Sequence, residues 1–387
     1  MDFALTESQE LIKKEVGALA RNFSLDYWLA KDDKAEYPHE FVRAFADNGW
    51  LGIMIPEEYG GAGLGVTEAS LMLHEICASG AGTSGASPIH FYVFPPTPVI
   101  KYGTEAMKRK HLPTICTGET VMAFGVTEPN AGTDTSRIET RAERRGDGWV
   151  VNGRKVWTTN AQHATRILLL ARTSERDPRQ PLKGMTLFFT DFDRTAITVR
   201  PIDKLGRAAV DSDEIVIENL GVPDEDVVGT VGEGFYHLLD SLNPERIVVG
   251  IEAVGIGRAA LERAVAYAKE RIVFDRPIGK NQAIAHPLAH ATAELDAALM
   301  MCWKAAWLFD HGRPCGREAN TAKLLAAEAG WNACDAALQT FGGYGYAREF
   351  YVERLWREIR LYKIAPVSQE MALNYLAEHV LGLPRSY

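Results

Sequence analysis

The chain has 387 residues, of which 46% are hydrophobic and 24% are charged, a balance typical of globular proteins with a sizeable core. Its formal net charge of −9 at pH 7 excludes the basic face that nucleic-acid binding needs, so no nucleic-acid partner is expected. No apolar run approaches the roughly 20 residues of a membrane-spanning helix, so no membrane partner is expected either.

The first zone of the chain, residues 1–120, is predicted to be helical. Residues 6–9 (TESQ) have the form of a capping box, and the apolar residues that follow recur at helical spacing. The acidic residues of this first helix do not fit an Arg-rich transit peptide, and the segment is not a signal peptide. The five cysteines are scattered, odd in number and without a Cys-x-x-Cys pair, which indicates reduced thiols. These features favour a cytoplasmic protein.

Two further zones follow. Residues 121–230 contain short β-rich runs separated by turn residues, for example 149–151 and 185–189. Residues 231–387 return to helical patterns, which predict long segments near 244–271, 282–311 and 317–341 and a shorter one after Pro366. The order is therefore a helical block, a β block and a helical bundle.

Two glycine motifs and a histidine pair are candidate sites. Residues 255–260 (GIGRAA) match the Gly-x-Gly-x-x-Ala of dinucleotide-binding turns, but helical sequence surrounds them, so close packing of helices is the favoured interpretation. Residues 341–345 (FGGYG) either end a helix with a glycine turn or let the backbone approach a large ligand. His286 and His290 lack an identifiable further ligand, so no metal is expected.

Five motifs follow one another along the chain: residues 52–61 (GIMIPEEYGG), 124–134 (FGVTEPNAGTD), 152–160 (NGRKVWTTN), 271–274 (RIVF) with Gln282, and 339–345 (QTFGGYG). Together and in this order they resemble the FAD-dependent acyl-CoA dehydrogenase superfamily over essentially the whole chain. The resemblance implies an α+β multidomain fold with an N-terminal all-α domain (1–120), a central β-barrel or β-sandwich domain (121–230) and a C-terminal four-helix bundle (231–387).

The resemblance also implies an FAD site, an acyl-CoA site and a homotetramer. Residues matching the flavin-ring contacts are Phe124, Val126, Thr127 and Thr133, with Trp157, Thr158 and Thr159 behind them and Ser368 as a further cofactor contact. Residues matching the contacts to the FAD pyrophosphate and adenosine, several of them from a neighbouring subunit, are Arg271, Phe274, Gln282, Gln339, Gly342 and Gly343. Those matching the CoA contacts are Thr133, Asn243 and Arg246.

One family residue is missing. The family's Tyr-Glu-Gly-Thr, whose glutamate takes the α proton, aligns with residues 365–368 (APVS). Pro366 provides neither the carboxylate nor the backbone N–H that binds the thioester oxygen. Losing general-base catalysis typically costs about 10²–10⁴-fold in rate, and losing one oxyanion donor about 3–4 kcal/mol. The chain is therefore expected to be a divergent member.

Glu245 is the predicted substitute base, since it matches the helix position from which isovaleryl- and long-chain-type members take their glutamate. A carboxylate facing the acyl cavity would have its pKa raised by desolvation. The alternative is structural: Asn243 as N-cap, Pro244 at the first helical position and Glu245 in the first turn also form an ordinary helix start. Glu370 is a weaker candidate base.

The predicted function is α,β-dehydrogenation of an acyl-CoA thioester, with electrons passed to an electron-transfer flavoprotein. A first alternative keeps the fold and the flavin but changes the chemistry, as in enoyl-CoA reductases, desulfinases or nitroalkane oxidases. A second alternative is a non-catalytic acyl-CoA-binding protein. The sequence does not define the acyl chain.

Overall fold

The computed structural model describes residues 4–385, and its N-terminal part is helical, as predicted. Thr6 forms the expected capping box with Gln9. Trp28 and Phe41 are fully buried in the core of this part, with ring centroids 4.9 Å apart. The helices are α1 (Glu7–Arg21), α2 (Leu25–Lys34), α3 (His39–Asp47), α4 (Val66–Ile76), α5 (Gly82–His90), α6 (Thr97–Tyr102) and α7 (Glu105–Cys116).

The predicted β zone forms one hydrogen-bonded sheet in the order β6-β7-β3-β2-β4-β5-β8, with β1 paired in parallel to β4. β4 is buried along its whole length, which explains its uninterrupted apolar run. The long strand β3 carries two irregularities against β7, the second between Lys155 and Thr158. The strands are β1 (Met122–Gly125), β2 (Arg141–Arg145), β3 (Gly148–Thr159), β4 (Arg166–Arg172), β5 (Met185–Asp191), β6 (Ile197–Pro201), β7 (Ser212–Pro223) and β8 (Val227–Val228).

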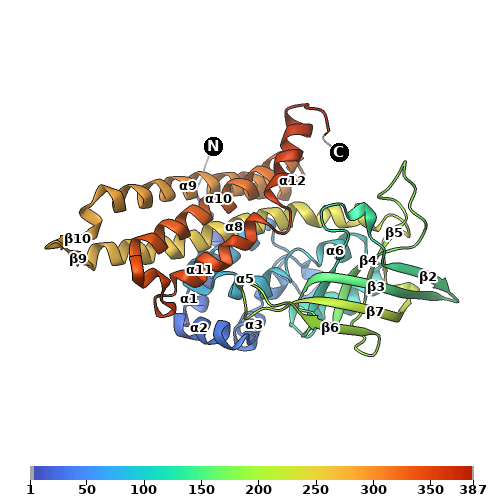
Figure 1. Ribbon diagram of the computed structural model, residues 1–387. Helices are drawn as coiled ribbons and strands as arrows, with labels where there is room; N and C mark the ends of the chain where they lie inside the picture. The colour runs from blue at the N-terminus through green and yellow to red at the C-terminus, as the bar shows by residue number, and fades with distance from the viewer. Residues whose placement is uncertain (1–3, 386–387) are drawn as a thin grey trace.

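The C-terminal part is a bundle dominated by three long helices (Figure 1). α8 follows β8, begins beside β5 and runs to the far end of the molecule, where a small hairpin leads into α9 (Figure 1). The predicted boundaries near residues 120 and 230 fall between α7 and β1 and between β8 and α8. The elements are α8 (Gly234–Glu270), β9 (Ile272–Val273), β10 (Arg276–Pro277), α9 (Gln282–Asp310), α10 (Gly316–Phe341), α11 (Val352–Ile359) and α12 (Gln369–Tyr375).

The start of α8 corrects a prediction. The helix begins at Gly234, not near residue 244, so Pro244 lies inside it and Asn243 is not an N-cap. An interior proline removes a helix hydrogen bond and costs about 3 kcal/mol or more. Pro244 is buried, and burial of the apolar residues that follow it on α8, Ile247 to Val249, offsets that cost. The interpretation of Glu245 as a first-turn acid that only stabilises a helix start is therefore wrong.

The glycines of the 255–260 motif allow close packing of helices, which is the interpretation that the sequence analysis favoured. A Cβ on Gly255 would lie 2.6 Å from the Cβ of Cys77, and one on Gly257 would lie 2.8 Å from Leu295 Cδ2. Both glycines are inside α8, where no strand-to-helix turn is available for a dinucleotide.

Two other expectations can be compared with the fold. All five cysteines are buried and free, so none forms a disulfide. Of the helices within residues 4–385, none combines the length and the apolar character that a membrane crossing requires. The cytoplasmic location stays a prediction.

Candidate functional site

The residues predicted to contact the flavin ring meet where β1 ends beside β3. The N–H of Val156 on β3 donates to the carbonyl of Thr127 just beyond β1, at 2.9 Å. Phe124, Val126 and Thr127 are half-buried, whereas Thr158 and Thr159 are buried and Thr133 is exposed. The fold thus brings both motifs to one end of the sheet, while their contact with FAD stays a prediction.

Trp157 has the properties of a residue that a planar ligand would cover. Its side chain is 57% exposed although it lies on a strand, and its backbone is left-handed, with φ of 61°. A bulky residue in that conformation is strained and persists only where the surrounding structure imposes it. Beside it, the buried hydroxyl of Thr158 has no hydrogen-bond partner in the described part of the chain. An exposed aromatic face and an unpaired hydroxyl fit a flavin ring, which stacks on apolar surface and accepts hydrogen bonds at its polar edge.

Lys155 and Glu128 hold this end of the sheet together. The fully buried Lys155 ammonium donates to the Glu128 carboxylate at 2.8 Å and to the Val126 carbonyl at 3.1 Å. Burial raises the pKa of Glu128, but Lys155 and the N–H of Glu139 outweigh that effect and lower it, so the carboxylate is ionised. Sequence reasoning missed this pair, because its two members lie in different motifs and nothing local indicates that they meet.

Lys155→Met is expected to destabilise the protein by about 3–5 kcal/mol, because the Glu128 carboxylate would stay buried without its partner. It should also weaken FAD retention, since the Val126 carbonyl loses its anchor. Thermal unfolding and the FAD content after gel filtration measure both effects. Lys183→Met, on a lysine whose side chain is 52% exposed, is the matched control and should change neither. Full stability of Lys155→Met would exclude a role for the pair.

The residues predicted for the FAD pyrophosphate and adenosine lie at the opposite end of the molecule. Arg271 directly follows α8, and Phe274, in the turn between β9 and β10, is 91% exposed. Gln282 opens α9, and Gln339 and Gly342 lie at the end of α10, where Gly342 has φ of 59° and terminates the helix. The 37 residues of α8 separate this cluster from the sheet by about 55 Å at 1.5 Å per residue. One chain therefore does not bring the two clusters together (Figure 1).

Glu245 is a buried carboxylate on α8. Glu245 is 6% exposed, and desolvation raises the pKa of its carboxyl to about 8, while the nearby Arg246 charge opposes this shift. Within residues 4–385, its carboxylate accepts no hydrogen bond and forms no ion pair. A buried acid that lacks a structural partner and titrates near neutral pH has the properties of a general base.

The turn that replaces the family's glutamate lies close to this part of α8. The buried Lys323 ammonium of α10 donates to the carbonyl of Val367, and Ser368 caps α12 by accepting from the N–H of Met371 at 3.3 Å. Glu370 is exposed, and hydrogen bonds, first from its own backbone N–H, lower its pKa. Of the two candidate carboxylates, only Glu245 is in an environment that suits a base.

Arg246 lines a hollow of about 260 Å³ that α12 closes and that Val367 also lines. Its guanidinium donates to the Asn243 amide oxygen at 3.2 Å, and its buried Nε has no hydrogen-bond partner among residues 4–385. A partly unsatisfied guanidinium fits an anionic ligand group. The structure thus places Arg246 and Asn243 together, and their contact with CoA stays a prediction.

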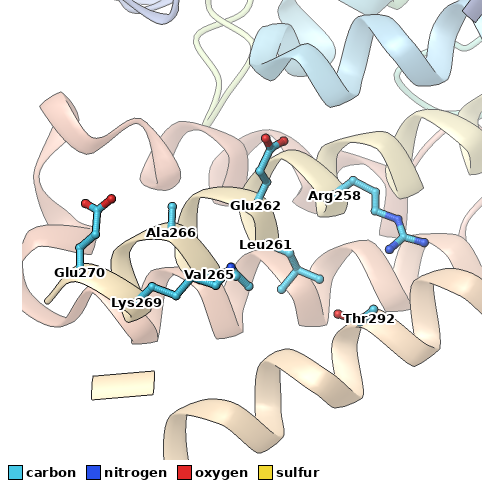
Figure 2. Close-up of a pocket in the computed structure, with 8 residues that line it drawn as sticks. All are labelled: Arg258, Leu261, Glu262, Val265, Ala266, Lys269, Glu270 and Thr292. Atoms are coloured by element: carbon cyan, nitrogen blue, oxygen red, sulfur yellow. The ribbon is translucent and has the colours of Figure 1, made fainter. Parts of the chain in front are cut away.

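A wider hollow of about 510 Å³ lies between α8 and α9, lined by Arg258, Leu261 and Lys269 among others (Figure 2). None of the predicted site residues lines it. In the described part of the chain, no group of three or more His, Cys, Asp or Glu side chains is arranged to hold a metal ion.

Comparisons with known proteins identify the same family along the whole chain. The models for the N-terminal, middle and C-terminal domains of acyl-CoA dehydrogenases match residues 6–119, 123–220 and 232–381. Acyl-CoA dehydrogenase FadE12 of Mycobacterium tuberculosis is 37% identical, covering 100% of this chain and 99% of the relative. The 3-(aryl)acrylate reductase of Clostridium sporogenes is also 37% identical, covering 97% and 99%. The structure of butyryl-CoA dehydrogenase from Megasphaera elsdenii superposes with a TM-score of 0.94 at 31% identity, covering 98% and 100%.

Proposed function

Because this chain belongs to the acyl-CoA dehydrogenase family of oxidoreductases, we propose that it binds FAD and dehydrogenates an acyl-CoA thioester between its α and β carbons. The buried, unpartnered carboxylate of Glu245 is the observation that carries this proposal. It supplies a base in a chain that has Pro366 at the position where the family usually has its catalytic glutamate.

Each group has a distinct role in the proposed reaction. Glu245 removes the α proton of the thioester, and Arg246 with Asn243 holds the CoA moiety. Arg246 points about 100° around α8 from Glu245, so one residue can meet the α carbon while the other binds CoA. FAD, when bound, would supply the acceptor for the hydride that leaves the β carbon. Trp157 and Thr159 provide the surface on which its ring lies, and burial of the site excludes water from the proton transfer.

We propose further that the protein acts as a homo-oligomer, a tetramer by resemblance to the family. The two predicted FAD clusters are separated by the length of α8, so a second copy has to supply Arg271, Phe274 and their neighbours to the flavin end of the first. Family membership supports an electron-transfer flavoprotein as the acceptor of the electrons.

The reverse reaction is a second candidate, because a relative at 37% identity is named a 3-(aryl)acrylate reductase. The same residues serve both directions, with Glu245 returning the proton to the α carbon. Anaerobic mixing of the yellow protein with a panel of saturated and unsaturated acyl-CoAs tests both. Bleaching by a saturated thioester supports dehydrogenation, and reoxidation of the reduced protein only by unsaturated acids or thioesters supports the reductase. A purified protein that binds no FAD would exclude both.

The pH dependence of flavin reduction follows from the Glu245 pKa. The base works only when ionised, and its pKa of about 8 means that the proton is still bound at neutral pH. The second-order rate constant for reduction by a saturated acyl-CoA is therefore expected to rise between pH 6 and 8 and level off above. Stopped-flow absorbance at low substrate concentration measures it. A rate that is constant from pH 6 to 9 would contradict the assignment.

A further inference from the structure

Arg207, in the loop before β7, is a buried guanidinium without an ion pair. Arg207 is 7% exposed, and within residues 4–385 no carboxylate oxygen lies within 4.0 Å of its guanidinium nitrogens. Its guanidinium donates to three hydroxyls: Nη1 donates to Ser87 Oγ at 3.1 Å, and Nη2 donates to Ser212 Oγ at 2.6 Å and to Thr159 Oγ1 at 3.3 Å. Buried charges in proteins are usually paired, so this arrangement requires an explanation.

Arg172, a buried arginine on β4, shows the contrast. Within residues 4–385 it also forms no ion pair, but it donates to the backbone carbonyls of Ser136, Ile138, Pro181 and Lys183. Carbonyl oxygens only accept hydrogen bonds, so the partners of Arg172 cannot donate a hydrogen bond to a further group. Hydroxyls accept and also donate, so a hydroxyl that accepts from a guanidinium becomes a stronger donor to a third group.

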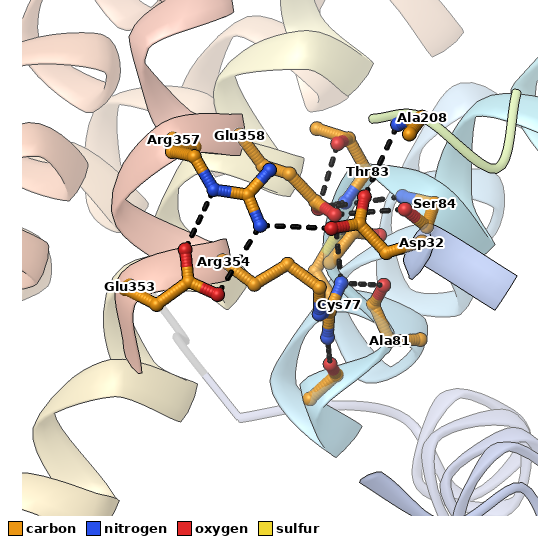
Figure 3. A network of polar contacts seen from close by, with 12 residues as sticks. Asp32, Cys77, Ala81, Thr83, Ser84, Ala208, Glu353, Arg354, Arg357 and Glu358 are labelled. Carbon is orange, nitrogen blue, oxygen red and sulfur yellow. Dashed lines mark hydrogen bonds and ion pairs between the residues drawn. The ribbon is translucent and has the colours of Figure 1, made fainter. Parts of the chain in front are cut away.

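The Arg207 loop is fixed from both sides. Arg357 of α11 donates to the Leu205 carbonyl at 3.2 Å, and the N–H of Ala208 donates to Asp32 of α2 at 3.2 Å. Figure 3 shows how Asp32 joins Ala208 to Arg357, which donates to it at 2.8 Å. The loop holds Arg207 in a left-handed conformation, with φ of 59°. Such strain is found where the surrounding structure imposes a particular side-chain position.

Three carboxylates act on Arg207 from beyond ion-pair distance, those of Asp211, Glu358 and Glu252, and each of them has another partner. Glu358 is bound to Arg354 at 2.7 Å, and Glu252 is bound to His90 at 2.8 Å and to the Tyr362 hydroxyl. Asp211 accepts from the backbone N–H of Gln162 at 3.1 Å. Within residues 4–385, the groups in direct contact with the Arg207 guanidinium are therefore the three hydroxyls, and its charge acts through the Thr159 hydroxyl on the group that this hydroxyl meets.

We propose that Arg207 is a positioning residue that stabilises the negative charge of the reduced flavin through the Thr159 hydroxyl. This rests on the proposed function, which places the flavin ring at Thr159. In that reaction the thioester loses a proton to Glu245 and a hydride, with both electrons, to the flavin, and gains a carbon–carbon double bond. The flavin thereby gains one negative charge. The guanidinium stays protonated throughout, so it favours the reduced form.

The midpoint potential of the bound FAD tests the proposal. Arg207→Gln removes the charge and should lower the ratio of reduced to oxidised flavin at a fixed potential by at least ten-fold, which is about 30 mV for a two-electron couple. Arg207→Lys keeps the charge and should retain most of the wild-type value. Arg172→Gln is the matched control: it removes an equally buried arginine and should leave the potential unchanged. An Arg207→Gln protein that keeps FAD and the wild-type potential would overturn the proposal.

A second measurement needs no variant. The reduced flavin of the wild-type protein should keep the absorption spectrum of its anionic form to a pH clearly lower than reduced free FAD in the same buffers. Protonation at the same pH as free FAD would overturn the proposal even if Arg207→Gln does not fold. Neither measurement depends on the acyl-CoA reaction. If the protein binds FAD but no thioester reduces it, the proposed function is wrong, and the midpoint potential of the bound FAD still tests the role of Arg207.

Discussion

Glu245→Gln is expected to slow the reduction of bound FAD by a saturated acyl-CoA by about 10²–10⁴-fold, because the amide cannot accept the α proton. The side chain keeps its size, and Glu245 is not among the predicted FAD contacts, so the variant should remain yellow. Stopped-flow absorbance under anaerobic conditions measures the rate. Glu370→Gln is the matched control on the exposed candidate and should react like the wild type. Undiminished reduction of the Glu245→Gln protein would remove this residue from the mechanism.

The same variant has a defined effect on stability, which serves as its folding control. In the native protein Glu245 keeps its proton up to about pH 8, whereas the ordinary value of 4.5 applies when the chain unfolds. Between these values the native state binds more protons than the unfolded state, so its stability falls as the pH rises, by up to about 1.4 kcal/mol per pH unit. Glu245→Gln removes that loss, so its Tm relative to the wild type should increase from pH 5 to pH 8.

Arg354→Leu is expected to cost about 3–5 kcal/mol of stability. Arg354 and Glu358 of α11 are fully buried and form an ion pair at 2.7 Å. Glu358 also accepts from the hydroxyls of Thr83 and Ser84, each at 2.7 Å, so the pair joins the C-terminal bundle to α5 (Figure 3). Removing the guanidinium would leave the Glu358 carboxylate buried without its cation. An unpaired buried charge destabilises a protein far more than the loss of both members of the pair does.

Urea unfolding measures this effect, and the chain offers a matched control. Arg43 and Asp47 form an ion pair with the same i,i+4 spacing at 2.8 Å, but their side chains are 73% and 55% exposed. Arg43→Leu should therefore change the stability by no more than about 1 kcal/mol. Equal effects of the two substitutions would show that burial does not govern the contribution of the α11 pair.

Much of the architecture could be predicted from local patterns. The order of helical, β and helical zones follows from hydrophobic periodicity, and the ends of α9 and α10 fall within a residue of their predicted limits. The Thr6 capping box was also predictable, and a helix end at Gly342 was one of the two interpretations of the glycine motif, because each depends on a few consecutive residues. Such features persist in the fold since no distant contact opposes them.

The start of α8 could not be predicted in this way. Asn243, Pro244 and Glu245 satisfy every local rule for a helix start, yet the helix continues through them for ten further residues toward Gly234. Buried contacts along that first part, including the packing of Gly234 against the backbone of Leu187, override the local preference. This extension changes the interpretation of Glu245 from a helix-start acid to a mid-helix acid.

The site was predictable only as separate motifs. Resemblance to a family identified the residues around Thr159 and Arg271 and implied that a neighbouring subunit supplies several of them, and the structure adds that one chain holds the two groups at opposite ends of α8. Arg207 was missed altogether, because its hydroxyl partners come from α5, β3 and the start of β7, far apart in the sequence. The Lys155–Glu128 pair was missed for the same reason. Contacts between distant segments leave no periodic signal in the sequence.

Exchange of the α hydrogen with solvent tests most directly whether Glu245 acts on the α carbon. A saturated acyl-CoA that bleaches the wild-type protein is incubated in deuterated buffer without an electron acceptor, and its mass is followed. The wild type is expected to introduce deuterium at the α carbon, and Glu245→Gln, with FAD bound, is expected to introduce none above the rate without protein. Equal exchange by the two proteins would contradict the assignment of Glu245 as the base.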